Sequence, residues 1–201
     1  MKKYLLAVLA LGATMMMACE PANNGDKEPE VTPDYVFDEA LFTETQSLLT
    51  PYGDYYENGT SNFYLEFAGM VAGEDGAPTS IHMLALDYNL AATVTDGAGV
   101  INADVDGTYP AGTYAPGYVQ EDYLMGSGVM VMDYATYTIT NYCFVSGEIS
   151  IVAKADGVYS VKGLVTCKDG KVVKLDYEGP VVFNDENGGI APLKKGVQLK
   201  K

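Results

Sequence analysis

The most constraining feature of this chain is a run of alternating apolar and polar residues over 147–184, divided by two Asp-Gly pairs. Alternation with a period of two is typical of β-strands that bury one face against a core. Asp156-Gly157 and Asp169-Gly170 supply the tight-turn chemistry between consecutive strands. The C-terminal third is therefore predicted to be an antiparallel meander, and the fold class to be all-β.

The register of this meander follows from the same pattern. Two-residue loops would set the buried face of one strand against the polar face of the next, whereas three-residue loops at 155–157 and 168–170 keep the buried faces together. We therefore expect a type I turn at each loop, closed by Gly157 and Gly170 with positive φ. The expected cross-strand pairs are Ala153 with Tyr159, Ile151 with Val161, and Val165 with Val173.

The rest of the chain also reads as strands and turns. Residues 81–90 are apolar on both faces, which is typical of a central strand. Residues 35–50 fit a helix or a strand, and a strand with irregular ends is favoured. Other expected strands are 62–70, 129–132 and 137–145, and 108–114 is expected to be an edge strand or a strand end. Turns are expected at 51–54 and 57–60, a short hairpin at 93–107 and a long loop at 116–127. The predicted architecture is an antiparallel β-sandwich of about eight to ten strands, with a lipocalin-like up-and-down β-barrel as the alternative.

Two cysteines belong to this predicted domain. A bulge is expected at Ser146-Gly147, shortly after Cys143 in the same predicted strand. In the register above, Cys167 faces Val145, so Cys143 is a diagonal neighbour at roughly 7–8 Å. That separation is at the limit for an unstrained disulfide. We therefore expect two buried free thiols.

The charge of the chain limits its partners. The formal net charge is −15, and all 12 basic residues are lysines. Arginine supplies the bidentate fork that grips phosphate, and cationic surfaces dominate binding to nucleic acids. We therefore expect no nucleic-acid partner.

Residues 1–18 have the features of an export signal. Lys2 and Lys3 precede an apolar run at 4–17 that is too short to span a bilayer as a stable helix. The run ends at Ala18 before Cys19, and this junction resembles a bacterial lipobox. The resemblance implies cleavage before Cys19 and lipid attachment to it; the alternative is an ordinary signal peptide with a chance cysteine. Several acyl chains on one residue form a lasting anchor.

The segment after Cys19 extends this resemblance. Residues 19–33 are acidic and proline-rich, as in a disordered tether; 34–187 would form one all-β domain, and 188–201 a last strand or a frayed tail. Acids close behind a lipidated cysteine resemble the export tag of surface lipoproteins from Bacteroidetes-type bacteria, and the whole chain resembles small outer-membrane lipoproteins of that kind. The resemblance implies a lipid-anchored protein of the outer membrane at the cell surface, with a periplasm-facing anchor as the alternative. It carries no catalytic motif.

Tyrosines and acids gather in two predicted loop regions, 52–57 and 109–123. Flat phenol rings stack on sugar faces, and neighbouring carboxylates accept hydroxyl hydrogen bonds. The structural alternative is that tyrosine suits half-buried strand positions. The candidate ligand-binding residues are Tyr52, Tyr55, Tyr56, Tyr118, Asp122 and Tyr123.

Two further patterns bear on chemistry. Asn102, Asp104 and Asp106 match the first half of a calcium loop, but Thr113 occupies the position of the bidentate acid. We expect no cofactor, with Ca²⁺ at this loop as the one candidate.

His82 is the only histidine, and no nucleophile-elbow motif accompanies it. The protein is therefore predicted not to be an enzyme, and a strand residue with a hydrogen-bonded ring is the expected role of His82.

Two functions remain open from the sequence. The first is an envelope-anchored binding module, with glycan as the candidate ligand of the tyrosine- and aspartate-rich loops. The second is a structural or protein-interaction lipoprotein of the outer membrane with no small ligand. A concave pocket lined by tyrosines and acids favours the first, and a flat apolar patch or an exposed sheet edge favours the second.

Overall fold

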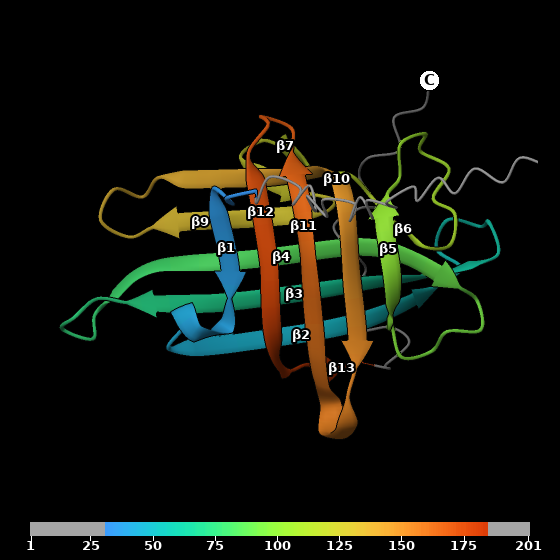
Figure 1. Ribbon diagram of the computed structural model, residues 1–201, viewed down its shortest axis with the longest axis horizontal. Coiled ribbons are helices and arrows are strands. Elements are labelled where there is room, and N and C mark those ends of the chain that lie inside the picture. The colour runs from blue at the N-terminus through green and yellow to red at the C-terminus, as the bar shows by residue number, and fades with distance from the viewer. Residues whose placement is uncertain (1–30, 185–201) are drawn as a thin grey trace, which may run out of the picture. The chain divides into compact units, whose positions relative to one another are not determined.

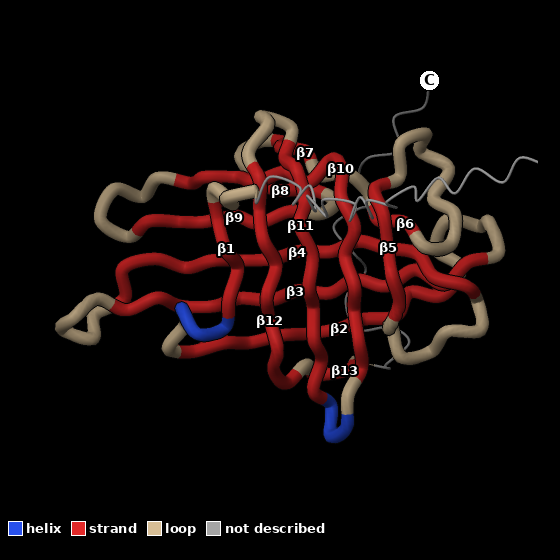
Figure 2. The backbone as a smooth tube through the Cα atoms, viewed as in Figure 1, coloured by secondary structure: helices blue, strands red, loops and turns tan. Residues whose placement is uncertain are grey.

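The computed structural model describes residues 31–184, and within them the fold is all-β, as predicted. The only helical elements there are two 3-10 turns, η1 (Glu39–Leu41) and η2 (Ala155–Gly157), drawn in blue in Figure 2. The described strands belong to one compact unit that begins at Thr32. In 31–184, no helix has the length and apolar character needed to cross a membrane. The predicted signal peptide, Cys19, most of the tether and the 188–201 tail lie outside the described residues.

Thirteen strands make up the described chain, several of them only two or three residues long. They are β1 (Tyr35–Asp38), β2 (Glu44–Gly53), β3 (Thr60–Ala72), β4 (Pro78–Ala91), β5 (Gly99–Ala103), β6 (Thr113–Tyr114), β7 (Tyr118–Gln120), β8 (Tyr123–Met125), β9 (Gly128–Asp133), β10 (Ile139–Ala153), β11 (Val158–Cys167), β12 (Val172–Pro180) and β13 (Val182–Phe183).

The long strands form two layers. Figure 1 shows β1, β12, β11, the second half of β10 and β5 in one layer, with β9, β4, β3 and β2 running across them behind. Sheets that cross in this way are joined at corners by strands that pass from one to the other. Five strands, β4, β9, β10, β5 and β6, also close into a ring. Because β5 and β6 pair in parallel, this closure is not an up-and-down barrel.

Strand β10 makes the corner between the layers. Its first residues pair with β9, and its later residues pair with β11 and β5. The register shifts between Phe144 and Ser146, which confirms the predicted bulge. At Gly147 φ is +109°, and a Cβ there would lie 2.4 Å from the carbonyl oxygen of Leu164. The strand therefore continues through the predicted bulge, around a bend that needs glycine.

The C-terminal meander has the predicted register. Ala153 pairs with Tyr159, and Val165 with Val173. Gly157 and Gly170 have φ of +73° and +84°, as expected. The predicted type I turn is wrong at the first loop, where Asp156 also has positive φ, at 58°.

The bulge has one more consequence, at the cysteines. Cys167 pairs with Phe144 instead of Val145, because the bulge removes one residue from the pairing. Cys143 and Cys167 are nevertheless both buried and free, as predicted.

Three local predictions were wrong. Residues 51–53 belong to strand β2 and not to a turn, because a register shift between Pro51 and Gly53 lets the strand continue past the proline. The hairpin expected at 93–107 does not form, because β5 pairs with β10 and β6, which lie far along the chain. The loop expected at 116–127 contains the hairpin β7–β8. Long-range pairing, which local pattern does not record, decided the case of β5, whereas the β7–β8 hairpin is a local pairing that the pattern did not reveal.

The core lies between the layers and includes several tyrosines. Tyr88, Tyr114 and Tyr177 are fully buried, and each hydroxyl donates to a backbone carbonyl. Buried hydroxyls need such partners because an unsatisfied polar group costs roughly 1–3 kcal/mol. Tyr114, which lies in the second tyrosine-rich stretch, is thus a core residue. Strand β4 pairs with β3, β9 and β6, which confirms its predicted central position.

Candidate ligand-binding groove

The candidate site lies on the outer face of the β9–β4–β3–β2 layer. Successive side chains of a strand point to opposite faces. Leu65 and Leu84 are buried in the core, so Glu66 and Met83, each one position away, lie on the other face. The hairpin β7–β8 supplies the opposite wall. Its two-residue turn, Glu121-Asp122, has positive φ at both residues, which is the type I′ geometry of a tight hairpin.

Between this hairpin and the sheet lies a cavity of about 530 Å³. That volume falls in the range of small-molecule sites, roughly 300–1,000 Å³. Most of its wall is apolar, with aromatic and polar groups among the apolar ones. Its lining residues are Tyr64, Glu66, Met83, Leu84, Ala85, Gln120, Glu121, Tyr123, Leu124, Met125 and Met130.

A second hollow of about 600 Å³ continues along strands β3 and β2. It shares Glu66 and Met83 with the first, and it reaches Pro180 and Val182 at the sheet edge. We call the two hollows together the outer groove. Its centre is therefore the pair of positions 66 and 83, where both hollows meet.

Glu66 is the carboxylate at the centre of the outer groove. Its partners across the strands are Leu48 and Ala85, neither of which is charged. Within residues 31–184 its carboxylate makes no hydrogen bond or ion pair. The side chain reaches solvent, but the surrounding groups partly desolvate it, and this raises the pKa of the Glu66 carboxyl. The pKa of Tyr64 is also raised, first by burial and then by the charges of Glu66 and Asp87.

Tyrosines from two distant segments meet in a cluster that does not line the groove. Tyr55 packs edge-on against Tyr56 with centroids 5.1 Å apart, and Tyr56 stacks on Tyr109 at 4.1 Å. The Tyr56 hydroxyl donates to Asp87 Oδ2 at 3.1 Å, and Asp87 is only 2% exposed. Asn62 Nδ2 donates to Asp87 Oδ1 at 2.9 Å. The buried carboxylate thus fixes Tyr56 in place, and Tyr109 covers one face of its ring.

The tyrosine-rich stretches also contain strained backbone. Six non-glycine residues of the described chain have positive φ, and four of them, Glu57, Tyr109, Glu121 and Asp122, lie in the tyrosine-rich stretches 52–57 and 109–123; the other two are Tyr137 and Asp156. A non-glycine residue in this region costs of order 1–3 kcal/mol and persists only when its surroundings enforce it. Asn58 Nδ2 does so here by donating to the carbonyl oxygens of Thr108 and Tyr109, at 3.2 and 2.7 Å.

The predicted binding residues therefore fall into three groups. Tyr123 lines the groove and is 71% exposed. Tyr52, Tyr55 and Tyr56 belong to the tyrosine cluster and do not line the groove; desolvation raises the pKa of Tyr52, and the charges of Glu66 and Asp87 raise it further. Tyr118 and Asp122 do not line the groove: Tyr118 pairs with Met125 in the hairpin, and Asp122 forms its turn.

Sequence reasoning missed the floor of the groove. Tyr64, Glu66, Met83 and Met130 sit on strands whose outward positions alternate with core positions. The alternation identifies them as outward-facing, but it does not show that a hairpin from 118–125 covers them. The one local signal for the groove in the sequence was Glu66, a glutamate flanked by apolar outward-facing residues.

The calcium-loop residues have structural roles. Asp104 is buried, and its two carboxylate oxygens accept the backbone amides of Asp106, Gly107 and Tyr109. Asp106 accepts from the amide and hydroxyl of Thr108, and Asn102 lies in strand β5. Across 31–184, no three His, Cys, Asp or Glu side chains are grouped so that they could hold a metal ion. The carboxylates of this loop therefore accept hydrogen bonds from the backbone of the same loop.

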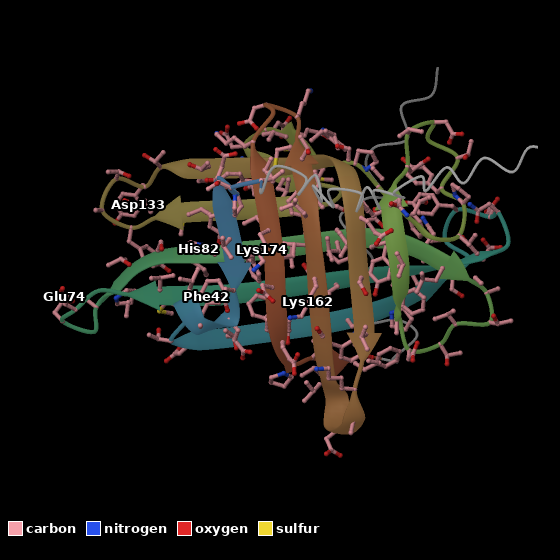
Figure 3. All side chains as sticks on the ribbon, viewed as in Figure 1. Phe42, Glu74, His82, Asp133, Lys162 and Lys174 are labelled. Carbon is pink, nitrogen blue, oxygen red and sulfur yellow. The ribbon has the colours of Figure 1, made fainter. Side chains whose placement is uncertain are left out.

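His82 has the expected hydrogen-bonded ring. Its Nδ1 lies 2.5 Å from the Tyr35 hydroxyl and its Nε2 lies 2.8 Å from Ser80 Oγ. The Phe42 ring packs edge-on at 5.5 Å between centroids, and both residues are labelled in Figure 3. Burial lowers the pKa of the imidazole. The ring is thus tied into the sandwich rather than facing the groove.

No family model, curated protein or solved structure matches the chain.

Proposed function

We propose that this protein is a lipid-anchored binding module of the outer membrane, displayed at the cell surface, which holds a small ligand in the outer groove. Cys19 would carry the lipid, and residues 20–33 would be the tether. The observation that carries the proposal is the cavity of about 530 Å³ between the β7–β8 hairpin and the sheet. Tight-turn and strand geometry hold both of its walls, so the site would be largely formed before a ligand arrives.

Ring-bearing ligands suit this site. Tyr123 presents an exposed ring at the rim, and Tyr64 contributes a second phenol to the wall. Gln120, Glu121 and Glu66 supply polar groups beside these rings. Glycan, the ligand class expected from the sequence, would use the rings for stacking and the polar groups for its hydroxyls. The apolar share of the wall extends the candidates to other compounds with an apolar body.

The proposal is tested by a binding screen on the lipidated protein in nanodiscs of zwitterionic lipid. Oligosaccharides and small aromatic compounds of each charge would be screened by ligand-observed NMR, with empty nanodiscs as the blank. Every hit would then be titrated against Tyr123→Ala. Loss of one stacking contact is expected to weaken binding roughly three- to tenfold.

Tyr137→Ala is the matched control, because Tyr137 is 78% exposed and does not line the groove. It should bind as the unmodified protein does. Equal weakening by both substitutions would place the binding elsewhere, and no binding by any compound would favour the structural or protein-interaction role instead.

A further inference from the structure

Charge is divided unequally between the two layers of the domain. All lysines of the described chain lie between residues 154 and 174, in the hairpins of β10, β11 and β12. Lys162 and Lys174 both bind the carboxylate of Asp176, at 2.8 and 2.7 Å. Figure 3 labels these two lysines on the strands of the front layer. Within the described chain, none of the residues that line the outer groove is a lysine.

The groove itself carries carboxylates. Glu66 lies at its centre between Leu48 and Ala85, and Glu121 lies on the hairpin wall. Glu66 is exposed to solvent on one side, but the apolar groups beside it partly desolvate its carboxylate, and a cation that enters with a ligand would offset this partial desolvation. An anionic ligand would meet the opposite situation, since neither wall offers it a positive charge.

We infer that the ligand of the outer groove is a small amine, with an apolar body and one ammonium group that binds Glu66. This rests on the proposed binding function. The ammonium would pair with the carboxylate and lie beside the phenol rings of Tyr64 and Tyr123, whose faces attract cations. Met83, Met125 and Met130 would surround the apolar body, and methionine adapts readily to irregular shapes.

The raised pKa of Glu66 agrees with this assignment. Desolvation favours the neutral acid, and an adjacent ammonium favours the carboxylate, so amine binding and protonation of Glu66 compete. Binding is therefore expected to weaken as the pH falls through that raised pKa. A neutral ligand would show no such loss.

The test uses three probes of similar shape and different charge: phenethylamine, 2-phenylethanol and 3-phenylpropionate. Each is titrated into the lipidated protein in zwitterionic nanodiscs at pH 7.5, with ¹³C-methyl methionine as the reporter. The methyl signals of Met83, Met125 and Met130 report on the groove, and that of Met70, which does not line it, is the internal control. Phenethylamine is expected to move the three groove signals with a Kd roughly tenfold below that of 2-phenylethanol, a difference of about 1.4 kcal/mol. The anion is expected to bind most weakly.

Glu66→Gln should remove the preference for the amine and leave the affinity for 2-phenylethanol unchanged. Glu148→Gln, the same change on an exposed strand position of the other layer, should alter neither. If 2-phenylethanol binds as tightly as the amine, or if Glu66→Gln keeps the preference, the amine inference is overturned and the binding function stands. If only sugars move the groove signals, the same conclusion follows. If no probe and no library compound moves them, the binding function itself fails.

Discussion

The phenol rings of Tyr56 and Tyr109 stack with their centroids 4.1 Å apart and 16° between their planes. This contact joins the 54–59 loop to the 108–112 loop, and the Asn58 side chain reinforces it through the carbonyl of Tyr109. The Tyr56 hydroxyl then ties both loops to the buried Asp87 on β4. The two loops are therefore held together by one stacked and hydrogen-bonded ring pair.

Removing the hydroxyl from this pair should destabilise the domain. Tyr56→Phe takes one donor from a buried carboxylate, and we expect it to lower the free energy of unfolding by about 1–2 kcal/mol. Urea unfolding followed by circular dichroism measures this. Tyr123→Phe is the control, because its ring is 71% exposed and the same change should stay within about 0.5 kcal/mol. An equal effect of both substitutions would contradict the anchoring role of Tyr56.

Glu66→Gln should stabilise the protein at neutral pH. The pKa of Glu66 is raised in the folded state, so the folded chain holds a proton to higher pH than the unfolded chain does, and ionisation at neutral pH costs stability. This cost disappears as the pH falls through the raised pKa. The Tm of Glu66→Gln should exceed that of the unmodified protein at pH 7.5, and the gap should close near pH 4. A gap that does not change with pH would show that another effect of the substitution dominates.

The two kinds of glycine in the C-terminal meander should respond differently to valine. Gly170 has positive φ with open space around its Cβ position, so Gly170→Val should cost about 1–2 kcal/mol from backbone strain alone. Gly147 has positive φ and also faces the Leu164 carbonyl at 2.4 Å, so Gly147→Val should cost about 3 kcal/mol or more. Urea midpoints compare the two. Equal losses in the free energy of unfolding would mean that the backbone at the β10 corner shifts enough to accommodate the valine side chain.

Cys143 and Cys167 should titrate as two free thiols. Both are buried, and burial together with the nearby Asp169 carboxylate raises the pKa of the Cys167 thiol to about 12. A thiol-reactive dye should therefore react slowly with the native protein and with two groups per chain once it is denatured without reductant. A lipidated Cys19 would not add to this count, because its sulfur is alkylated. A result of no free thiols would contradict the structure at the β10–β11 pair.

Cys19→Ser should abolish membrane anchoring. With no sulfur to receive the lipid, the chain should remain as the precursor or appear in the aqueous phase. Detergent phase partitioning and intact mass, compared with the unmodified protein, measure this. If Cys19→Ser partitions into detergent as the unmodified protein does, and its intact mass shows the same processing and modification, the lipobox interpretation is ruled out.

Much of the local structure followed from residue pattern. The period-two alternation and the glycines at 157 and 170 were enough to predict the register from Ala153–Tyr159 to Val165–Val173. They were sufficient because a slip of one residue would expose an entire buried face. The candidate site followed less well. Tyr123, a candidate ligand-binding residue, lines the groove, whereas Asp122, another candidate, lies in a turn whose residues both have positive φ.

The sequence by itself determined the all-β class, the buried face of the meander strands, and how these strands pair across their tight turns. All of these depend on contacts between residues close in the chain. The tertiary structure alone decided that β10 bends from one layer to the other, that β5 pairs in parallel with β6, and that the β7–β8 hairpin covers Glu66. Outward-facing residues carry no signal of what lies opposite them, because many sequences satisfy the solvent-facing side of a strand equally well. The groove therefore became visible only when distant segments were brought together.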